Sequence, residues 1–465
     1  MGVAPSFRLV RDIPVDATTW DVVVAGGGMA GVSAAVCAAR LGGKVLLVEA
    51  TGCLGGMATS GLVNTFGPMA DGERQLVRGF MGELVETLHC RGFMPAEVAP
   101  DWWRTAYLTW TPFQQEGLKL VLDELAAAAG VEVRFFTHTT DADADPASGL
   151  VRGIIVRDTA GHGYLGARTF VDCTGDAVLA ALAGAPCRVA GRDTPRAMPG
   201  SVMSLLAGID FSKHRKEEVS GRLEQAIRDG HFTQPDRHFP GVTRVDETTG
   251  YLNGGHLYGI SPFDARSMSE GARQGRRLAR EYHAFCRRYL PGFANAELVA
   301  TAPSLGIRES RRIEGEYELT EADFLARRQF PDQIGVYNRP LDVHAYDASP
   351  EQHERLLRDF VKAGRLQPGE CFGIPYGVLV PRGWKNLWVA GRCLSCDNRV
   401  LGAVRAMPAV AMLGQAAGTA ALQSLRTGAP ASALDTATLV HTLRSAGAYL
   451  PQAITAPEMT RREAP

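Results

Sequence analysis

The pattern of apolar and polar residues near the N-terminus predicts a strand, a helix and a second strand in close succession. Apolar runs cover residues 21–25 and 44–49, and an apolar helical stretch lies between them at about 29–41. Gly42 and Gly43 follow that stretch, where glycine commonly ends a helix. Two strands joined through a helix in so short a span form a parallel β-α-β unit. The pattern therefore predicts an α/β fold with a parallel sheet.

Later segments continue this pattern. They are, in order, a helix at 112–129, strands at 131–136, 153–157, 168–171 and 386–390, and a helix of small residues at 405–425. Thr111 is the predicted N-cap of the first of these helices, and Pro112 suits its first position. Residues 200–370 differ from the rest, because they are richer in charge, hold most of the histidines and lack the β-α-β rhythm. We interpret that segment as an inserted cap.

Composition narrows the class of protein. The 465 residues include 49 basic and 50 acidic side chains, so the net charge of -1 gives no case for nucleic-acid binding. Nine cysteines are too few and too scattered for a secreted disulfide framework. No apolar run reaches the roughly 18–20 residues of a membrane helix, and the charged N-terminus lacks a signal-peptide core. We expect a soluble cytoplasmic protein without nucleic-acid or membrane partners.

The segment Gly26–Gly31 fits the dinucleotide-binding pattern G-x-G-x-x-G in the required strand-to-helix context. Gly26 permits the tight turn, Gly28 lets backbone N–H groups approach a pyrophosphate, and Gly31 lets helix and strand pack closely. The helix N-terminus favours the anion, and Glu49 at the end of the next strand would bind a ribose. A dinucleotide site is therefore predicted at this turn.

A second G-x-G-x-x-G match, Gly161–Gly166, lies between two predicted strands and opens no helix. We interpret it as a hairpin turn. The sequence therefore predicts one dinucleotide site and no separate NAD(P)H-binding domain.

Three further motifs decide which dinucleotide is bound. The glycine-rich stretch Gly52–Gly61 follows Glu49 closely, and two apolar strands run into the segments Val171–Asp176 and Asn386–Arg392. These segments resemble the flavin-contacting motifs of glutathione-reductase-like flavoproteins. The helix that begins near Arg405 would then point its positive end at the flavin and stabilise the reduced form. The resemblance implies FAD as the cofactor.

The residues expected to hold FAD come from all of these motifs. They are Gly26, Gly28, Met29, Ala30, Gly31, Glu49, Ala50, Gly55, Gly56, Met57, Ala58, Thr59, Thr174, Gly175, Asp176, Gly391, Arg392, Ala406 and Met407.

Over about residues 20–425 the chain resembles a bacterial group of FAD-dependent oxidoreductases distantly related to fumarate reductase and succinate dehydrogenase flavoproteins. The stretches that carry the resemblance are 305–315, 341–344, 374–376, 391–395, 405–408 and 414–418. The chain departs from the group at Cys396–Arg399, where members tend to be smaller or less charged.

The fold class implied is α/β, a Rossmann-like FAD-binding domain with a parallel sheet and helices, split by a mixed α+β cap. We expect the FAD-binding domain at 18–200 and 371–430 and the substrate or cap domain at 201–370. A C-terminal helical tail is expected at 431–465.

Two arginines are candidates for catalysis. Arg308 follows an apolar run and would clamp a substrate carboxylate bidentately in the cleft between cap and flavin. The alternative is a structural ion pair with Glu309, Glu314 or Glu316. Arg405 lies at the start of the flavin-facing helix, where a cation stabilises reduced flavin or a bound anion.

His344 is the best candidate for proton transfer, because the pKa of imidazole suits exchange near neutral pH. The alternative is a buried histidine satisfied by Asp342 or by backbone. His256 and Tyr376 are weaker candidates.

Cys393 and Cys396 form a C-x-x-C pair, which is either a redox dithiol beside FAD or a structural pair. We favour the structural interpretation, because disulfide reductases carry their pair just after the ribose-binding strand. No further Cys/His pair shows metal-ligand spacing, so no metal site is expected.

These observations predict an enzyme, an FAD-dependent oxidoreductase that desaturates or reduces a small anionic metabolite by hydride transfer. One alternative is an FAD monooxygenase or amine oxidase acting on a small molecule, and another is a non-catalytic flavin-binding sensor. The sequence leaves the substrate, the electron acceptor or donor and any homo-oligomer open.

Overall fold

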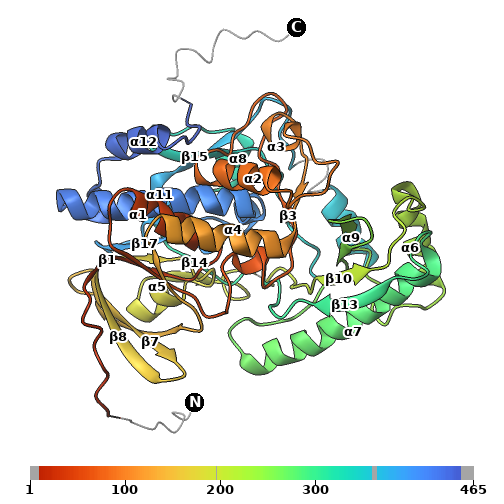
Figure 1. The fold of residues 1–465 in the computed structure, drawn as a ribbon, viewed down its shortest axis with the longest axis horizontal. Helices are drawn as coiled ribbons and strands as arrows, with labels where there is room; N and C mark the ends of the chain where they lie inside the picture. Colours follow the sequence, from red (N-terminus) through yellow and green to blue (C-terminus); the bar gives the residue numbers. More distant parts are fainter. Residues whose placement is uncertain (1–9, 195, 359–363, 452–465) are drawn as a thin grey trace.

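The chain forms a large α/β body with a smaller lobe at one side, in which α6, α7, β10 and β13 lie (Figure 1). This computed structural model describes residues 10–194, 196–358 and 364–451. Its strands are β1 (Trp20–Ala25), β2 (Val45–Val48), β3 (Thr65–Phe66), β4 (Thr111–Pro112), β5 (Glu132–Arg134), β6 (His138–Asp145), β7 (Leu150–Asp158), β8 (Gly161–Asp172), β9 (Cys187–Val189), β10 (Ser204–Ala207), β11 (Gly241–Arg244), β12 (Gly250–Asn253), β13 (Glu297–Thr301), β14 (Arg311–Ile313), β15 (Gln333–Tyr337), β16 (Phe372–Pro375) and β17 (Leu387–Val389). Its α-helices are α1 (Met29–Arg40), α2 (Phe80–Cys90), α3 (Asp101–Arg104), α4 (Gln115–Ala128), α5 (Val178–Ala183), α6 (Val219–Arg228), α7 (Ala265–Tyr289), α8 (Glu321–Leu325), α9 (Pro350–Leu356), α10 (Asn398–Val404), α11 (Met407–Thr427) and α12 (Thr436–Ser445).

A seven-stranded sheet organises the body, in the order β5-β2-β1-β8-β7-β6, with β17 also paired to β8. Strands β5, β2, β1, β8 and β17 run parallel, whereas β7 and β6 add antiparallel pairs. Alternate residues of β1 point to opposite faces, so Val22 and Val24 join one hydrophobic cluster and Val23 and Ala25 join another. The predicted parallel α/β fold is confirmed.

The strand-helix-strand unit at 20–48 confirms the sequence prediction almost residue by residue, but the start of the next helix was predicted wrongly. Thr111 and Pro112 form β4, which pairs with β3, and α4 begins only at Gln115 with Gln114 as its N-cap. Proline has no N–H to donate, and it is tolerated at the edge of a sheet, as in this two-residue ladder. The second glycine match opens no helix, as predicted, but it is not the hairpin turn. Gly161–Gly166 form the first part of β8 and pair with Gly153–Asp158 of β7, and the turn lies at Thr159 and Ala160.

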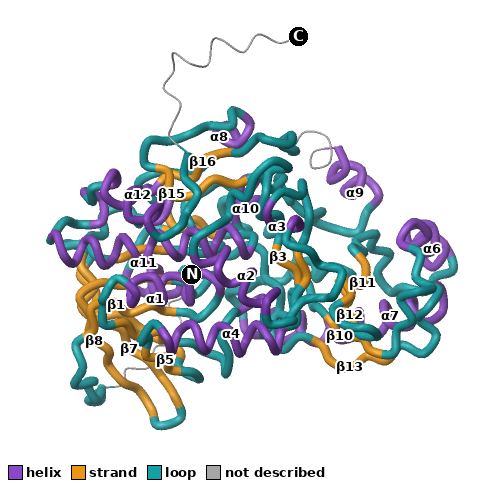
Figure 2. Tube along the Cα trace, turned by 45° about the horizontal axis from the view of Figure 1, so that its top comes forward, coloured by secondary structure: helices purple, strands orange, loops and turns teal. Residues whose placement is uncertain are grey.

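Helix α11 lies directly against α1, although the two come from opposite ends of the chain (Figures 1 and 2). A Cβ atom built on Gly414 would lie 2.0 Å from the Ala30 oxygen, and one on Gly418 would lie 2.1 Å from the Ala34 oxygen. The Ser33 hydroxyl donates to the Ala411 oxygen at 2.7 Å. Glycine is therefore required on α11 for the two backbones to meet.

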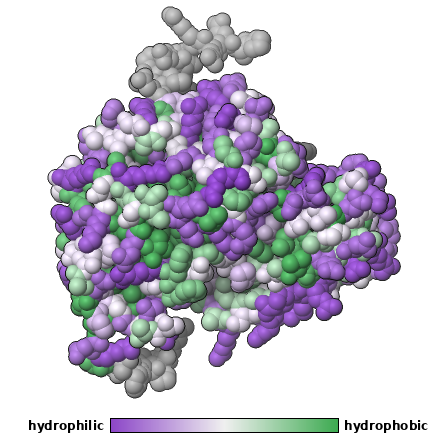
Figure 3. Space-filling view, viewed as in Figure 1, coloured by the Kyte–Doolittle hydropathy of each residue, from purple (hydrophilic) through white to green (hydrophobic). Residues whose placement is uncertain are grey.

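The smaller lobe has its own core. Its sheet has the order β11-β12-β10-β13, and a separate hydrophobic cluster extends from Val202 to Ala302 beneath α6 and α7. Figure 3 shows that the outer edge of this lobe is largely hydrophilic. Part of the segment that the sequence assigned to the cap packs instead into the two clusters of the body, through Ile313, Leu319, Phe324, Phe330, Ile334, Tyr337, Leu341 and Leu366.

Beyond the FAD-associated segments, the predicted C-terminal tail contains α12, and its residues 452–465 lie outside the described part of the chain. Among the described residues, no single helix is both long and apolar enough to cross a membrane. Only α10 and α11 taken together meet that length and composition, and they are bent by 91° at their junction.

Candidate functional site

The glycine turn between β1 and α1 has the geometry that a dinucleotide pyrophosphate requires. Gly26 has a φ of +96°, and a Cβ atom on Gly31 would lie 1.8 Å from the Gly26 oxygen. A Cβ atom on Gly28 would meet nothing within 4 Å, so space remains directly above the turn. No side chain caps α1 at Gly28, which leaves the N–H groups of its first turn available to an anion.

The loop after Glu49 lies beside this turn. The Gly55 N–H donates to the Gly27 oxygen at 2.8 Å, and a Cβ atom on Gly56 would lie 3.0 Å from the Gly28 Cα. The Glu49 carboxylate accepts from the Gly27 N–H at 2.6 Å and from the Thr51 hydroxyl at 2.8 Å. The first two predicted FAD motifs are therefore in direct contact.

The third and fourth predicted motifs meet on the other side of β1. Arg392 Nη2 lies 2.6 Å from the Asp176 carboxylate, and the Ser310 hydroxyl donates to the same carboxylate at 2.5 Å. A Cβ atom on Gly391 would lie 3.9 Å from the Ala30 Cβ. Burial opposes ionisation of Asp176, but Arg392 and Ser310 outweigh it and lower the pKa of this carboxyl.

Helix α11 begins at Met407 without a side-chain cap at Ala406, so its first N–H groups are also free of side-chain partners. The residues expected to hold FAD thus form two uncapped helix starts, a glycine turn with open space above it and an acidic strand end. This arrangement fits FAD, with Gly28 and α1 toward the pyrophosphate and Glu49 toward the ribose.

Two of the three predicted catalytic residues, Arg405 and His344, contact one carboxylate, that of Asp342. Arg405 Nη2 lies 3.0 Å from Asp342 Oδ2, and His344 Nε2 lies 3.3 Å from Oδ1. Arg339, which the sequence did not suggest, lies 2.7 Å from Oδ2. Burial opposes ionisation, but His344, Arg339 and Arg405 outweigh it and hold the pKa of Asp342 well below its usual value.

Arg308 lies near this group without a carboxylate partner. Its Nη1 donates to the Pro199 oxygen at 2.7 Å, and among the described residues no carboxylate lies within ion-pair distance of it. Burial lowers the pKa of Arg308 to about 10. Of the proposed structural partners, Glu309 pairs with Arg312 at 2.5 Å instead.

Histidine side chains continue the polar group away from Asp342. His344 Nδ1 lies 2.8 Å from His256 Nε2, and His256 Nδ1 lies 3.0 Å from the Asp236 carboxylate. The His238 ring stacks on His256 with ring centroids 4.0 Å apart. Both ring nitrogens of His344 therefore face other side chains.

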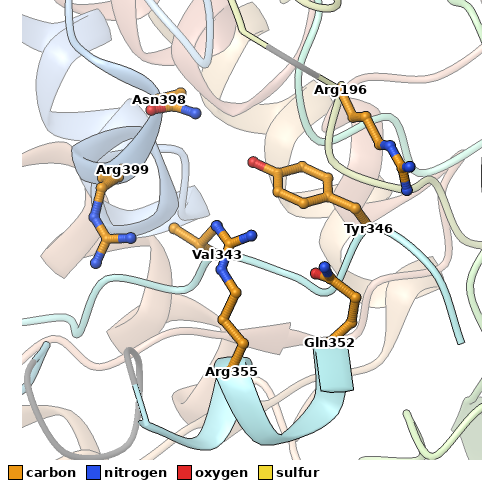
Figure 4. Close-up of a pocket in the computed structure, with 7 residues that line it drawn as sticks. All are labelled: Arg196, Val343, Tyr346, Gln352, Arg355, Asn398 and Arg399. Carbon is orange, nitrogen blue, oxygen red and sulfur yellow. The ribbon is translucent and has the colours of Figure 1, made fainter. Parts of the chain in front are cut away.

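A cavity of about 350 Å³ opens beside this polar group and is lined by Arg196, Val343, Tyr346, Gln352, Arg355, Asn398 and Arg399 (Figure 4). Arg355 extends from α9 toward Val343, with Arg399 on one side and Tyr346 on the other. A smaller adjoining cavity shares Val343 and Arg355 and is also lined by His344. The two cavities thus share a basic lining, and the smaller one reaches His344.

The remaining candidates have structural contacts. Tyr376 donates to the Ala431 oxygen at 2.9 Å and accepts from Trp388 at 2.7 Å. Cys393 and Cys396 are free, are buried in different hydrophobic clusters, and burial raises the pKa of both thiols. Asp397 and Arg399, two charged residues in the segment where the chain differs from the family that it resembles, have structural roles. Asp397 caps α10, and Arg399 forms an ion pair with Glu321 at 2.7 Å.

Sequence analysis missed Arg339, Asp236 and His238. The only local signal for Arg339 is its position three residues before Asp342. His238 and Asp236 lie in a segment without a motif, and they reach the site only through folding of the lobe. No sequence spacing could have placed His256 beside His344, which lies 88 residues away.

Several solved structures resemble this chain at low sequence identity. Similar solved structures include a geranylgeranyl bacteriochlorophyll reductase-like protein from Thermoplasma acidophilum, at 12% identity, a TM-score of 0.45, and coverage of 93% of this chain and 83% of that one. Others are the flavin-dependent brominase Bmp2, at 13% identity, a TM-score of 0.47 and coverage of 92% and 83%, and the p-nitrophenol 4-monooxygenase PnpA from Pseudomonas putida DLL-E4, at 12% identity, a TM-score of 0.45 and coverage of 96% and 92%.

A search of curated proteins finds no match to this sequence. The model of the family described as FAD dependent oxidoreductase, in contrast, matches residues 21–443, which is most of the chain. The chain therefore belongs to the FAD-dependent oxidoreductase family.

Proposed function

We propose that this FAD-dependent enzyme desaturates or reduces a small anionic metabolite in the cytoplasm. The observation that carries the proposal is the Arg308 guanidinium, which has no carboxylate partner among the described residues. A partly buried cation without a counter-ion costs stability unless an anion neutralises it. Arg339 and Arg405 add two further cations, whereas Asp342 is the one carboxylate that both contact. This excess of positive charge supports a carboxylate-bearing substrate.

FAD, when bound, accepts or donates a hydride. In the proposal, Arg308 binds the substrate carboxylate bidentately and so fixes its orientation. Asp342 holds Arg405 in place, and Arg405 supplies positive charge at the junction of α10 and α11. The basic cavity beside His344 supports entry of an anion from that side.

The resemblance of the motifs to fumarate reductase flavoproteins supports a reaction at a carbon-carbon double bond. That kinship and the direction of the reaction are parts of the proposal. The lobe of β10–β13 and α7 supports an enzyme rather than a sensor, since a flavin-binding sensor needs no separate lobe over a cationic site.

The test begins with anaerobic mixing of the yellow protein with a panel of small mono- and dicarboxylates, followed by loss of the flavin absorbance. For a carboxylate that bleaches the flavin, Arg308→Ala should lower the second-order rate of reduction by roughly 30–1,000-fold, equivalent to about 2–4 kcal/mol. Arg308→Lys should recover only part of the rate, because lysine keeps the charge but loses the fork.

Arg312 provides the matched control, because it is a buried arginine paired with Glu309 and Asp193. Arg312→Lys should lower the melting temperature while leaving the flavin reduction rate nearly intact. The proposal is wrong if both Arg308 variants remain loaded with FAD and reduce at the wild-type rate.

A further inference from the structure

Four side chains form a continuous polar chain from the lobe to the body. Asp236 lies 3.0 Å from His256 Nδ1, His256 Nε2 lies 2.8 Å from His344 Nδ1, and His344 Nε2 lies 3.3 Å from Asp342. The order is carboxylate, imidazole, imidazole, carboxylate. Both imidazoles are buried, so water does not replace any of these contacts.

The protons of this chain can be placed in two ways. If each neutral ring points its single N–H at the carboxylate that it faces, His256 Nε2 and His344 Nδ1 face each other as two lone pairs at 2.8 Å, and a metal ion or an additional proton lies between them. If instead the Tyr258 hydroxyl, 3.1 Å from His256 Nδ1, donates to that nitrogen, His256 Nε2–H donates to His344 Nδ1. The first arrangement is the one that accommodates a metal ion.

A third imidazole favours the metal ion. One ring nitrogen from each of His238, His256 and His344 lies within 4.8 Å of the others. His238 Nε2 is buried and has no hydrogen-bond partner within the described part of the chain. A third lone pair beside the first two gives the set of three imidazoles that transition metals bind in proteins.

We propose that His238, His256 and His344 bind a divalent transition-metal ion, with Asp236 and Asp342 holding two of the rings from behind. A carboxylate on the far nitrogen of a ligating histidine fixes its tautomer and raises its basicity. All three ligands are imidazole nitrogens, which favours zinc or iron over magnesium or calcium, since the latter two prefer oxygen ligands. This inference does not depend on the proposed anionic substrate.

The site imposes two conditions on the ion. The His238 ring is stacked on His256, with an interplanar angle of 23°, so it must turn out of the stack to reach a shared ion. Turning breaks no hydrogen bond at its unpartnered Nε2. The positive charges of Arg308, Arg339 and Arg405 repel a metal ion bound nearby. The carboxylates of Asp236 and Asp342 offset only part of this repulsion. We therefore expect an anion to occupy the open coordination position of the metal.

The test uses the FAD-loaded full chain, treated with a chelator, dialysed and then equilibrated with Zn²⁺. Wild type should retain about one equivalent of zinc per chain after gel filtration, measured by elemental analysis against flavin absorbance. His256→Ala and His238→Gln should retain only background zinc. Asp236→Asn should keep the ligands but weaken zinc binding by about 10–100-fold.

His283→Ala is the control, because His283 donates to or accepts from nothing in this group and contacts the Ala296 oxygen at 2.8 Å. It should bind zinc as wild type does.

Each variant is first checked for FAD content and melting temperature, and His238→Gln serves if His256→Ala does not fold. Wild type without stoichiometric zinc, or equal zinc in the ligand variants and wild type, would refute the site and leave His256 and His344 joined by a hydrogen bond. Flavin reduction by carboxylates is measured on the same samples, so that failure of the metal site is separable from failure of the proposed function.

Discussion

Three glycines of one motif are required for three different reasons. Gly26 is needed for its positive φ of +96°, whereas Gly31 is needed because any side chain would collide with the Gly26 oxygen. Gly28 is in neither situation, since its Cβ direction is open. Gly26 and Gly31 are therefore required by the fold itself, whereas the open space at Gly28 is available to a ligand.

This difference predicts opposite outcomes for two similar substitutions. Gly28→Val should fold with a melting temperature near that of wild-type apoprotein but lose FAD, because its side chain occupies the pyrophosphate approach. Gly31→Val should fail to fold or melt much earlier, since overpacking against rigid backbone costs about 1–3 kcal/mol or more. Flavin absorbance per chain and thermal melting distinguish the two effects. A yellow, fully loaded Gly28→Val protein would contradict the assignment.

The individual residues of the candidate site could be predicted from the sequence, but the side chains that they contact could not. Arg308, His344 and Arg405 were selected for chemistry, and all three lie near Asp342. Whether Arg308 had an ion-pair partner could not be predicted, because Glu309 is adjacent in sequence yet pairs with Arg312. Side-chain direction at such positions depends on tertiary packing and not on spacing.

At the scale of elements, strong periodic segments were predictable and short ones were not. The units around β1, α1 and β2 carry long apolar runs, so burial and local preference agree there. Thr111 and Pro112 carry a helix-start signal, but pairing with Thr65 and Phe66 outweighs it. A two-residue ladder leaves no periodicity from which to predict it.

The contact between α1 and α11 gives a prediction for an element that touches no substrate. Gly418→Ala should push α11 away from α1, because the new Cβ would lie 2.1 Å from the Ala34 oxygen. We expect a fall in stability of about 1–3 kcal/mol or more, together with weaker FAD retention, because α11 carries Ala406 and Met407. Melting and flavin content measure both.

Gly221 in α6 provides the matched control for this substitution. A Cβ atom there meets nothing within 4 Å, so Gly221→Ala should be neutral or stabilise by about 0.5–1 kcal/mol through helix propensity. Equal behaviour of the two variants would show that the helix contact is not tight.

At the scale of the molecule, the two G-x-G-x-x-G matches have different structures. Gly26–Gly31 opens α1, whereas Gly161–Gly166 belongs to β8 in a hairpin with β7. Because an anion-binding helix start is missing from the second match, we predict slow or no flavin reduction by NADH or NADPH alone. Anaerobic stopped-flow measurement checks this, and rapid saturable reduction by either nucleotide would contradict it.

The parallel sheet and its interruption were predictable because β-α-β units have a strong pattern. The extent of the lobe core was not predictable, since residues 313–341 are as rich in charge as the lobe but place their apolar side chains in the hydrophobic clusters of the body. A high proportion of charged residues indicates that one face of a segment is exposed to solvent. It does not indicate which hydrophobic core the opposite face packs against.

The pairing of α1 with α11 also governs how the molecule is made. The contact from Ser33 to Ala411 spans 378 residues of chain, so the ribosome needs roughly 20–75 s to deliver the second helix after the first. During that interval the apolar face of α1 is exposed and the nucleotide turn has no completed pocket behind it. The cofactor site therefore cannot be complete until the C-terminal part of the chain has been made and has packed against α1.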